Sequence, residues 1–126
     1  MKDSVMMAEL SWPEFAGKVK EGAIAFLPIG ATEQHGPHMG LGVDVVLPTA
    51  ICERVARAVG GIVAPAIPYG YKSQPRSGGG EGFPGTISLD ANTLSLVVRD
   101  VVRGLGTHGI RRVVVCCGHF ENVWAA

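Results

Sequence analysis

The sequence lacks an excess of charge of either sign. Among its 126 residues, 11 Lys and Arg stand against 11 Asp and Glu, so the formal net charge is zero. The most basic segment, the adjacent pair Arg111-Arg112, leads straight into an apolar run. We therefore expect no nucleic-acid partner, because binding to a phosphate backbone needs a patch of positive charge.

Long apolar runs are also missing. No stretch of about eighteen apolar residues occurs, so no transmembrane helix is predicted. The amino-terminal segment MKDSVMMAEL has no continuous apolar core and is a poor signal peptide. The three cysteines, Cys52, Cys116 and Cys117, do not form a disulfide pattern, which favours a reducing compartment. We predict a cytoplasmic protein without a membrane partner.

The sequence does contain enough apolar residues to build a core, since they make up 47% of the chain. Apolar runs that are typical of buried strands alternate with segments of helical pattern. Strands are expected at 23–29, 62–67 and 113–117. Helices are expected after a capping box at Ser11 to Glu14, from about Val46 to Val59 behind a capping Asp44, and from Ala91 to Leu105 behind a capping Asp90; residues 68–89 are expected to form a long loop.

This alternation predicts an α/β fold, a layered α/β/α domain with a mainly parallel sheet. Three strands make a small sheet and leave at least one face poorly covered. We therefore expect residues 1–126 to be part of a larger domain.

Polar clusters follow the first and third predicted strands. Glu33 and His35 lie in the first cluster, with Asp44 downstream, and His119 and Glu121 lie in the second. The carboxyl ends of parallel strands meet at one edge of a sheet, where ligands bind. In an extended segment, side chains spaced i, i+2 point the same way, so each pair is expected to converge on one point.

These residue types favour a metal site. Imidazole and carboxylate groups together suit Zn²⁺, Mn²⁺ or Fe²⁺, and two histidines with three carboxylates suit two metals that share a bridging carboxylate. Any one of the residues alone would more often be an ordinary solvated side chain. The joint pattern carries the prediction.

His38 and the glycine-rich loop near these clusters each have two interpretations. His38 is predicted to contact a metal ligand and orient it without binding the metal itself. The alternative is that His38 is an ordinary polar residue. The triple glycine Gly78 to Gly80 allows backbone to approach a small ligand closely, so the loop is expected on the substrate side of the metals. A flexible surface loop is the alternative, and the Gly-Lys-Ser/Thr ending of a phosphate-binding loop is absent.

The run LPIGATEQHGPH, residues 27–38, resembles the signature of the creatininase family. Asp44 before the sequence LPTA, the segment FPGT at 83–86 and the segment GHFEN at 118–122 follow in the same order as in that family. The loop that contains the triple glycine is similar to that of the creatinine-hydrolysing branch rather than the peptidase or deformylase branches.

The resemblance implies an α/β metal-dependent hydrolase of amides that interconverts creatinine and creatine through metal-activated water. It places Glu33 and His119 on the more exchangeable metal, usually manganese, and His35 and Glu121 on zinc, with Asp44 bridging the two. It also implies that Ser77 and Phe120 lie against a small-molecule substrate and that the chain forms a homo-oligomer, a hexamer.

Two residues depart from the family pattern. Cys117 stands where Asn is usual, and Phe120 where Tyr is frequent, which removes a hydroxyl near the substrate. Family members are also considerably longer. The resemblance therefore implies that residues 1–126 are the amino-terminal part of a single domain and that the proton donor lies beyond Ala126. Hydrolysis of another amide, in a formamide or a peptide, is an alternative, and a catalytically inactive fragment is a third possibility.

Overall fold

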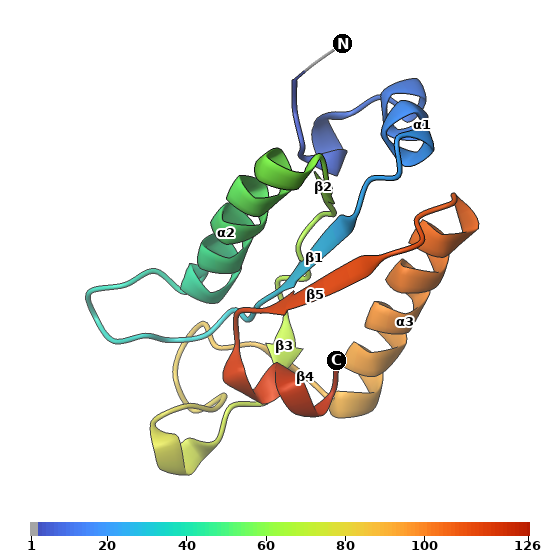
Figure 1. The fold of residues 1–126 in the computed structure, drawn as a ribbon. Helices are drawn as coiled ribbons and strands as arrows, with labels where there is room; N and C mark the ends of the chain where they lie inside the picture. The colour runs from blue at the N-terminus through green and yellow to red at the C-terminus, as the bar shows by residue number, and fades with distance from the viewer. Residues whose placement is uncertain (1–2) are drawn as a thin grey trace.

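The computed structural model describes residues 3–126, apart from the side chain of Ser77. The α-helices are α1 (Trp12–Lys20), α2 (Val43–Val59) and α3 (Ala91–Thr107). The strands are β1 (Ala25–Ile29), β2 (Ile62–Val63), β3 (Gly70–Tyr71), β4 (Ser88–Leu89) and β5 (Val113–Cys117), and short 3-10 helices are η1 (Met7–Glu9), η2 (Pro75–Ser77) and η3 (Phe120–Trp124). The predicted α/β class is confirmed (Figure 1).

The main sheet has the order β2-β1-β5, and both pairings are parallel. The β1 side chains are buried at all five positions because β1 has a neighbour on each edge and a helix over each face. On one face Phe26 packs with Cys52 and Ala56 of α2. On the other, Leu27 and Ile29 pack with Leu94 and Val98 of α3. The expected layered arrangement therefore forms, with β1 at its centre.

Helix α1 begins where the capping box predicts. The Glu14 carboxylate accepts hydrogen bonds from the backbone N–H of Ser11 at 2.8 Å and from its hydroxyl at 2.6 Å. Phe15 and Val19 then pack beside Ala23 at the amino end of β1. Helix α1 thus closes the end of the sheet opposite the predicted polar clusters.

The start of α2 corrects the prediction. The helix begins at Val43 with Gly42 at the N-cap, so Asp44 lies within the first turn and is not the cap. The Gly42 carbonyl accepts bonds from the N–H groups of Val45 and Val46 at 2.9 and 3.0 Å, which closes the turn three residues earlier than expected. A carboxylate in this turn is favoured by the helix dipole. The predicted end holds: Gly60 adopts a left-handed conformation with φ 68°.

Two other expectations about the middle of the chain are wrong in detail. The second strand spans only Ile62–Val63 rather than 62–67, although Ile67 still forms an isolated bridge to Ile29. The predicted loop 68–89 contains a parallel two-stranded sheet, in which Gly70 pairs with Ser88 and Tyr71 with Leu89. Ladders of two residues are too short to produce a periodic sequence pattern, which is why they were not predicted.

Helix α3 starts at the expected place but runs to Thr107 rather than Leu105. Asp90 occupies the N-cap position, yet its side chain makes no capping bond. The Asp90 carboxylate instead accepts a hydrogen bond from Lys72 Nζ at 2.6 Å, which ties α3 to the end of β3. No helix within residues 3–126 is long and apolar enough to cross a membrane.

Candidate metal centre

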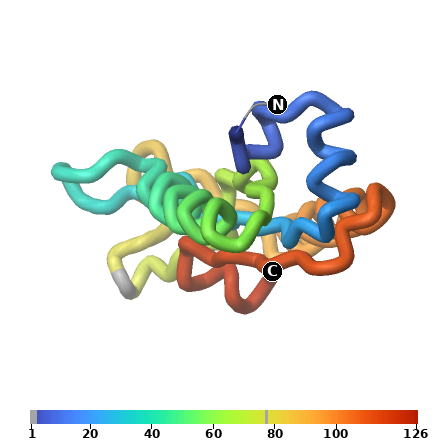
Figure 2. The backbone as a smooth tube through the Cα atoms, turned by 45° about the horizontal axis from the view of Figure 1, so that its top comes forward, coloured from blue at the N-terminus to red at the C-terminus, as the bar shows by residue number. Residues whose placement is uncertain are grey.

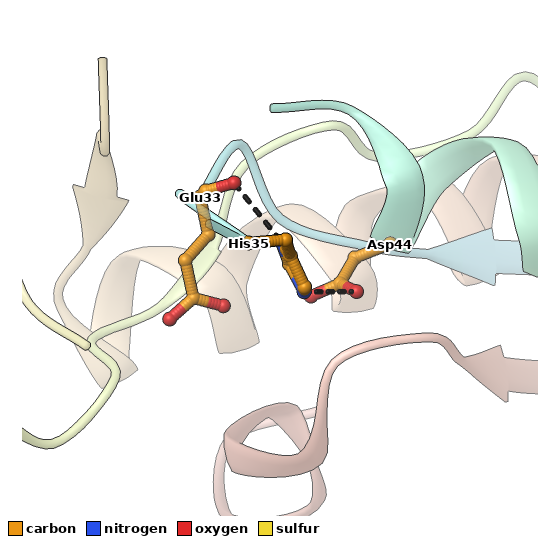
Figure 3. A group of neighbouring side chains, drawn as sticks. All are labelled: Glu33, His35 and Asp44. Atoms are coloured by element: carbon orange, nitrogen blue, oxygen red, sulfur yellow. Dashed lines mark hydrogen bonds and ion pairs between the residues drawn. The ribbon is translucent and has the colours of Figure 1, made fainter. Parts of the chain in front are cut away.

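The polar clusters after β1 and β5 meet beyond the carboxyl ends of these two strands of the main sheet. Glu33 and His35 follow β1, whereas His119 and Glu121 follow β5. Asp44 reaches the same place from the first turn of α2 (Figure 3). The structure thus brings together side chains that are separated by up to 88 positions in the sequence, from Glu33 to Glu121.

Two glycines allow Asp44 to reach the centre. Gly30 follows β1 and Gly118 follows β5, and a Cβ atom on either would overlap the backbone carbonyl of Asp44. At Gly118 a Cβ would also collide with the ring of Pro48. The first turn of α2 therefore packs directly on the ends of both strands because neither strand end carries a side chain.

The Asp44 carboxylate lies between the two histidines. Its Oδ1 atom is 3.1 Å from Nε2 of His35, and its Oδ2 atom is 3.1 Å from Nδ1 of His119. Each carboxylate oxygen thus faces a different imidazole. A carboxylate placed in this way could bridge two cations, which stays a prediction.

The other nitrogen of each histidine ring contacts a backbone carbonyl. Nδ1 of His35 is 3.0 Å from the Glu33 carbonyl, and Nε2 of His119 is 2.9 Å from the Tyr71 carbonyl. A carbonyl only accepts, so each of these nitrogens carries the proton and donates. In a neutral ring held in this way, the nitrogen that faces Asp44 would keep its lone pair for a cation, which is how proteins commonly orient metal-binding histidines.

His119 is the most buried member of the group, with 4% of its side chain exposed. Its Nδ1 atom lies 3.2 Å from Glu33 Oε2 as well as near Asp44, and its Nε2 atom lies 3.3 Å from Glu121 Oε2. Candidate ligand atoms of Glu33, His35 and Asp44 all lie within 4.8 Å of one another. Glu121 contacts the ring nitrogen that points away from Asp44, so its assignment to the same metal as His35 stays a prediction.

The donor set fits divalent cations. Three carboxylates, from Glu33, Asp44 and Glu121, lie 12–15% exposed around two imidazoles. So much negative charge in a half-buried site is costly unless cations offset it. Mixed nitrogen and oxygen ligands suit Zn²⁺ and Mn²⁺.

A cavity of about 400 Å³ opens onto this group. All five side chains line it, together with Phe120, Ser73 and Gly79. A Cβ atom on Gly79 would lie 3.0 Å from Glu33 Oε1 and would overlap the Ser73 side chain. The triple-glycine loop therefore approaches the Glu33 carboxylate with bare backbone, and its place on the substrate side of the metals stays a prediction.

The remaining predicted residues fall in different places. Phe120 is 75% exposed at the cavity wall and stacks edge-on with Trp124, with ring centroids 6.4 Å apart. His38 is exposed in a turn, and no hydrogen bond or ion pair in the described part of the chain joins it to the five candidate ligands. Ser77 lies in η2, but its side chain is outside the described residues. Roles for His38 and Ser77 stay predictions.

The expected reason for the pairing of His119 with Glu121 is wrong. His119 is extended, but Glu121 is the second residue of the 3-10 helix η3, so the two are not alternate residues of one extended segment. They meet because the chain turns sharply after His119. No sequence pattern marks this turn, because a single 3-10 turn is too short to have a period.

Asn122 is a residue that the sequence did not single out. Its side chain is fully buried and donates from Nδ2 to the Gly30 carbonyl at 2.9 Å, while its Oδ1 accepts from the Tyr71 N–H at 2.9 Å. It thus fixes the end of β1 to β3, whose Tyr71 carbonyl orients His119. Apart from its place as the last residue of the family segment GHFEN, no sequence pattern marked this amide for such a role.

A parallel α/β sheet with imidazoles and carboxylates gathered beyond its strand ends defines a class of α/β proteins with a site suited to divalent metals. The creatininase family model, described as creatinine amidohydrolase, matches residues 8–126. The chain belongs to the creatininase family.

Individual relatives agree with this assignment. The chain is 53% identical to the creatinine amidohydrolase of Pseudomonas putida over 123 residues, which is 97% of this chain and 47% of that relative. It is 35% identical over 108 residues to the mycofactocin precursor peptide peptidase of Mycolicibacterium smegmatis, which is 81% of this chain and 41% of the relative. The chain therefore spans about half the length of the curated relatives it matches.

Solved structures show the same fold. A crystal structure of creatinine amidohydrolase superposes with a TM-score of 0.93 at 52% identity, covering 98% of this chain and 48% of that one. A mutant creatininase complexed with creatine and a creatininase with Mn each superpose with a TM-score of 0.92 at 51% identity, covering 97% of this chain and 48% of theirs. A mutant of Zn-Zn type superposes with a TM-score of 0.93 at 50% identity, covering 98% and 48%.

Proposed function

We propose that this chain provides the two-metal centre of an enzyme that hydrolyses the cyclic amide of creatinine to creatine and catalyses the reverse reaction. The observation that carries the proposal is the Asp44 carboxylate, whose two oxygens each face a different histidine at 3.1 Å. A carboxylate divided in this way is suited to two cations, one beside each imidazole. The 53% identity to a creatinine amidohydrolase favours creatinine among the possible amides.

Each candidate ligand has a proposed task. Asp44 holds both cations, Glu33 and His119 complete one set of ligands, and His35 and Glu121 complete the other. Two divalent ions in such a site acidify a water molecule and polarise a carbonyl group. Of the two ions, we propose Mn²⁺ for the first set and Zn²⁺ for the second.

The residues around the ligands orient the two imidazoles and shape the cavity for the substrate. The carbonyls of Glu33 and Tyr71 hold the two imidazoles in the tautomers that leave a nitrogen free toward Asp44. Phe120 offers the cavity an apolar ring without a hydroxyl, so it can pack against a small planar substrate but cannot move a proton. Ser77 is proposed to contact the substrate, and His38 to orient a ligand from the loop outside the centre.

Other properties are proposed for the whole protein. Solved relatives include a creatininase complexed with creatine and forms described as Zn-Zn and Mn, which supports a small-molecule substrate and divalent metals here. We further propose a hexamer and a cytoplasmic location. Sedimentation of the purified protein and fractionation of expressing cells test these two statements.

The deciding experiment measures metal and turnover separately. The purified chain is loaded with Zn²⁺ and Mn²⁺, and bound metal is counted by mass spectrometry; we expect two ions per chain. Creatinine, a formamide and a short peptide are then offered as substrates, and creatine formation is followed. Two ions with creatinine turnover support the proposal in full.

Other results separate the alternatives. Turnover of a peptide or a formamide but not of creatinine would replace the substrate and keep the centre. Two bound ions without turnover of any amide would identify this chain as an inactive carrier of the centre. Fewer than two ions per folded chain would contradict the two-metal proposal.

A further inference from the structure

Gln34 lies between two candidate metal ligands, yet none of the tasks proposed above uses it. Its side chain is half-buried and lines the cavity of the metal centre. The amide makes two hydrogen bonds: Oε1 accepts from the Gly36 N–H at 2.9 Å, and Nε2 donates to the Gly78 carbonyl at 2.5 Å. The first bond lies within residues 32–36 after β1, which we name the ligand loop. The second bond reaches the triple-glycine loop, 44 positions away.

The two partners fix the orientation of the amide. A backbone N–H only donates and a backbone carbonyl only accepts, so the oxygen of Gln34 must face Gly36 and its nitrogen must face Gly78. Both ends of the side chain are therefore used, one by each loop. A side chain with only one of these groups could make only one of the two bonds.

The backbone of the ligand loop is anchored on its other side. The Gln34 N–H donates to Thr86 Oγ1 at 3.1 Å, and the Thr32 carbonyl accepts from the Ile87 N–H at 3.0 Å. Thr86 is buried, with 8% of its side chain exposed. The ligand loop thus has support that does not depend on the Gln34 amide.

The triple-glycine loop has less support. The Gly80 N–H donates to Oγ of the buried Ser73 at 2.8 Å. The N–H groups of Gly78 and Gly79 bond to carbonyls of the same loop, at 3.2 Å each. Within the described part of the chain, the bond from Gln34 is the one hydrogen bond that joins residues 78–80 to the ligand loop. The position of the glycines relative to the metal centre therefore depends on Gln34.

That position matters because the loop forms part of the cavity wall. Gly78 and Gly79 line the cavity beside Glu33 and Gln34. Figure 1 and Figure 2 both show the connection after β1 and the loop between β3 and β4 extending from the same end of the molecule, away from α1. Two neighbouring loops without a sheet between them need a direct tie to keep a fixed separation.

We infer that Gln34 is a positioning residue that holds the triple-glycine loop against the metal centre. The substrate then meets a wall of glycine backbone at a fixed place beside Glu33. The effect on substrate rests on the proposed function, because the wall acts on an amide only if one binds in this cavity. Without the tie, the loop is in place for only a fraction of the time, and the apparent affinity for substrate falls by that fraction.

The alternative is that the amide only closes the turn at Gly36. That role needs the oxygen of Gln34 and not its nitrogen. Gln34→Glu separates the two roles, because a carboxylate still accepts from the Gly36 N–H but cannot donate to the Gly78 carbonyl. Gln34→Met keeps the length of the side chain and removes both amide groups.

The first test measures the loop without substrate, on the chain loaded with metal. Arg76 is exposed in η2, just before the glycines, so trypsin cleavage after Arg76 reports opening of the loop. Both Gln34 variants should raise the cleavage rate by about three- to tenfold, which is the equilibrium effect of losing one hydrogen bond. Hydrogen exchange of the buried Gly80 amide should accelerate in parallel.

A matched pair of glycine variants displaces the loop independently of Gln34. Gly79 and Gly82 both lack a positive φ, so alanine is compatible with either backbone. A Cβ atom at Gly79 would overlap the Ser73 side chain, whereas one at Gly82 meets nothing within 4 Å. Gly79→Ala should therefore increase cleavage after Arg76, and Gly82→Ala should leave it unchanged.

The second test separates binding from chemistry. Gln34→Met should raise the KM for creatinine by about the same factor as the cleavage rate and lower kcat by less, because the loop positions substrate and does not touch the reacting atoms. Both metals should still be counted on the variant. If the unmodified chain turns over no amide, the proposed function fails, and the cleavage and exchange rates still decide whether Gln34 holds the loop.

Four results would overturn the inference. Unchanged cleavage and exchange in Gln34→Met would show that the loop needs no tie. Wild-type behaviour of Gln34→Glu would assign the amide to the turn at Gly36 alone. Loss of a metal from a folded Gln34→Met protein would make Gln34 part of the metal centre. A fall in kcat at unchanged KM would place Gln34 in the reaction itself.

Discussion

Strands β1 and β5 are neighbours of equal length and similar composition, yet they differ completely in burial. All five residues of β1 are buried, whereas none of the five in β5 is. The apolar runs look alike because each is suited to the interior of a parallel sheet. The difference comes from their neighbours: β1 lies between two strands, and among residues 3–126 β5 has a partner strand on one side only.

The candidate metal centre joins these two unequal strands. Glu33 and His35 come from the well-packed β1 side, while His119 and Glu121 come from the β5 side, and Asp44 lies between them. A centre built in this way depends on the relative position of the two strands.

The largest effect is expected at the shared residue. Asp44→Ala should abolish binding of both metals, because its two oxygens serve both sides. Glu33→Ala should weaken chiefly one metal. Metal counting by mass spectrometry checks both variants, with Asp100→Ala on the exposed face of α3 as the control. Equal loss of both metals in the Glu33 and Asp44 variants would argue against a bridging Asp44.

The contrast in burial is tested by truncating one residue in each strand. Leu27→Ala in β1 removes a side chain that is 0% exposed and should lower the free energy of unfolding by about 2–5 kcal/mol. Val115→Ala in β5, where 38% of the side chain is exposed, should cost less than about 1 kcal/mol. Urea denaturation measures both. Equal costs would mean that β5 is covered in solution.

The connection between the sides is tested at Asn122. Asn122→Leu removes the bonds to Gly30 and Tyr71 and should reduce metal affinity by about 10–100-fold, as is usual when the support of a metal ligand is lost. Asn92→Leu, on the exposed part of α3, is the control. Titration of the folded variants with Mn²⁺ separates this role from a purely structural one. A folded Asn122→Leu protein with unchanged affinity would remove Asn122 from the centre.

The smallest effect concerns the exposed pair Lys72 and Asp90. The hydrogen bond from Lys72, and then its charge, lowers the pKa of Asp90, and the same bond raises the pKa of Lys72. The stabilisation from Asp90 is present above its ordinary pKa of 3.8 and disappears as the pH falls through the lowered value. That from Lys72 is present below 10.5 and disappears as the pH rises through the raised value.

Asp90→Asn should therefore lower the melting temperature slightly at neutral pH and not at all in strong acid. The difference should shrink further in high salt, because both groups are exposed. Melting curves of the two proteins at acid and neutral pH make the measurement. A difference that persists in strong acid would assign the effect to the N-cap backbone instead of the ion pair.

Much of the fold could be predicted because long elements leave a periodic trace. The three strands of the main sheet were predicted, although β1 and β2 are shorter than expected, and so were the capping box of α1 and the glycine that ends α2. The two-residue strands β3 and β4 and the turn η3 were not, because elements so short have no period. The first turn of α2 was placed too late, since its start is decided by bonds to the Gly42 carbonyl rather than by a capping side chain.

The sequence by itself determined which residue types would gather at the sheet edge, because apolar strands that end in Glu and His place those groups at their carboxyl ends. It could not determine the order of contact within the centre. Only the tertiary structure decided that Asp44 lies between the two histidines, since that depends on α2 packing against the bare backbone of Gly30 and Gly118. The exposure of β5 was likewise decided by which strands are present beside it.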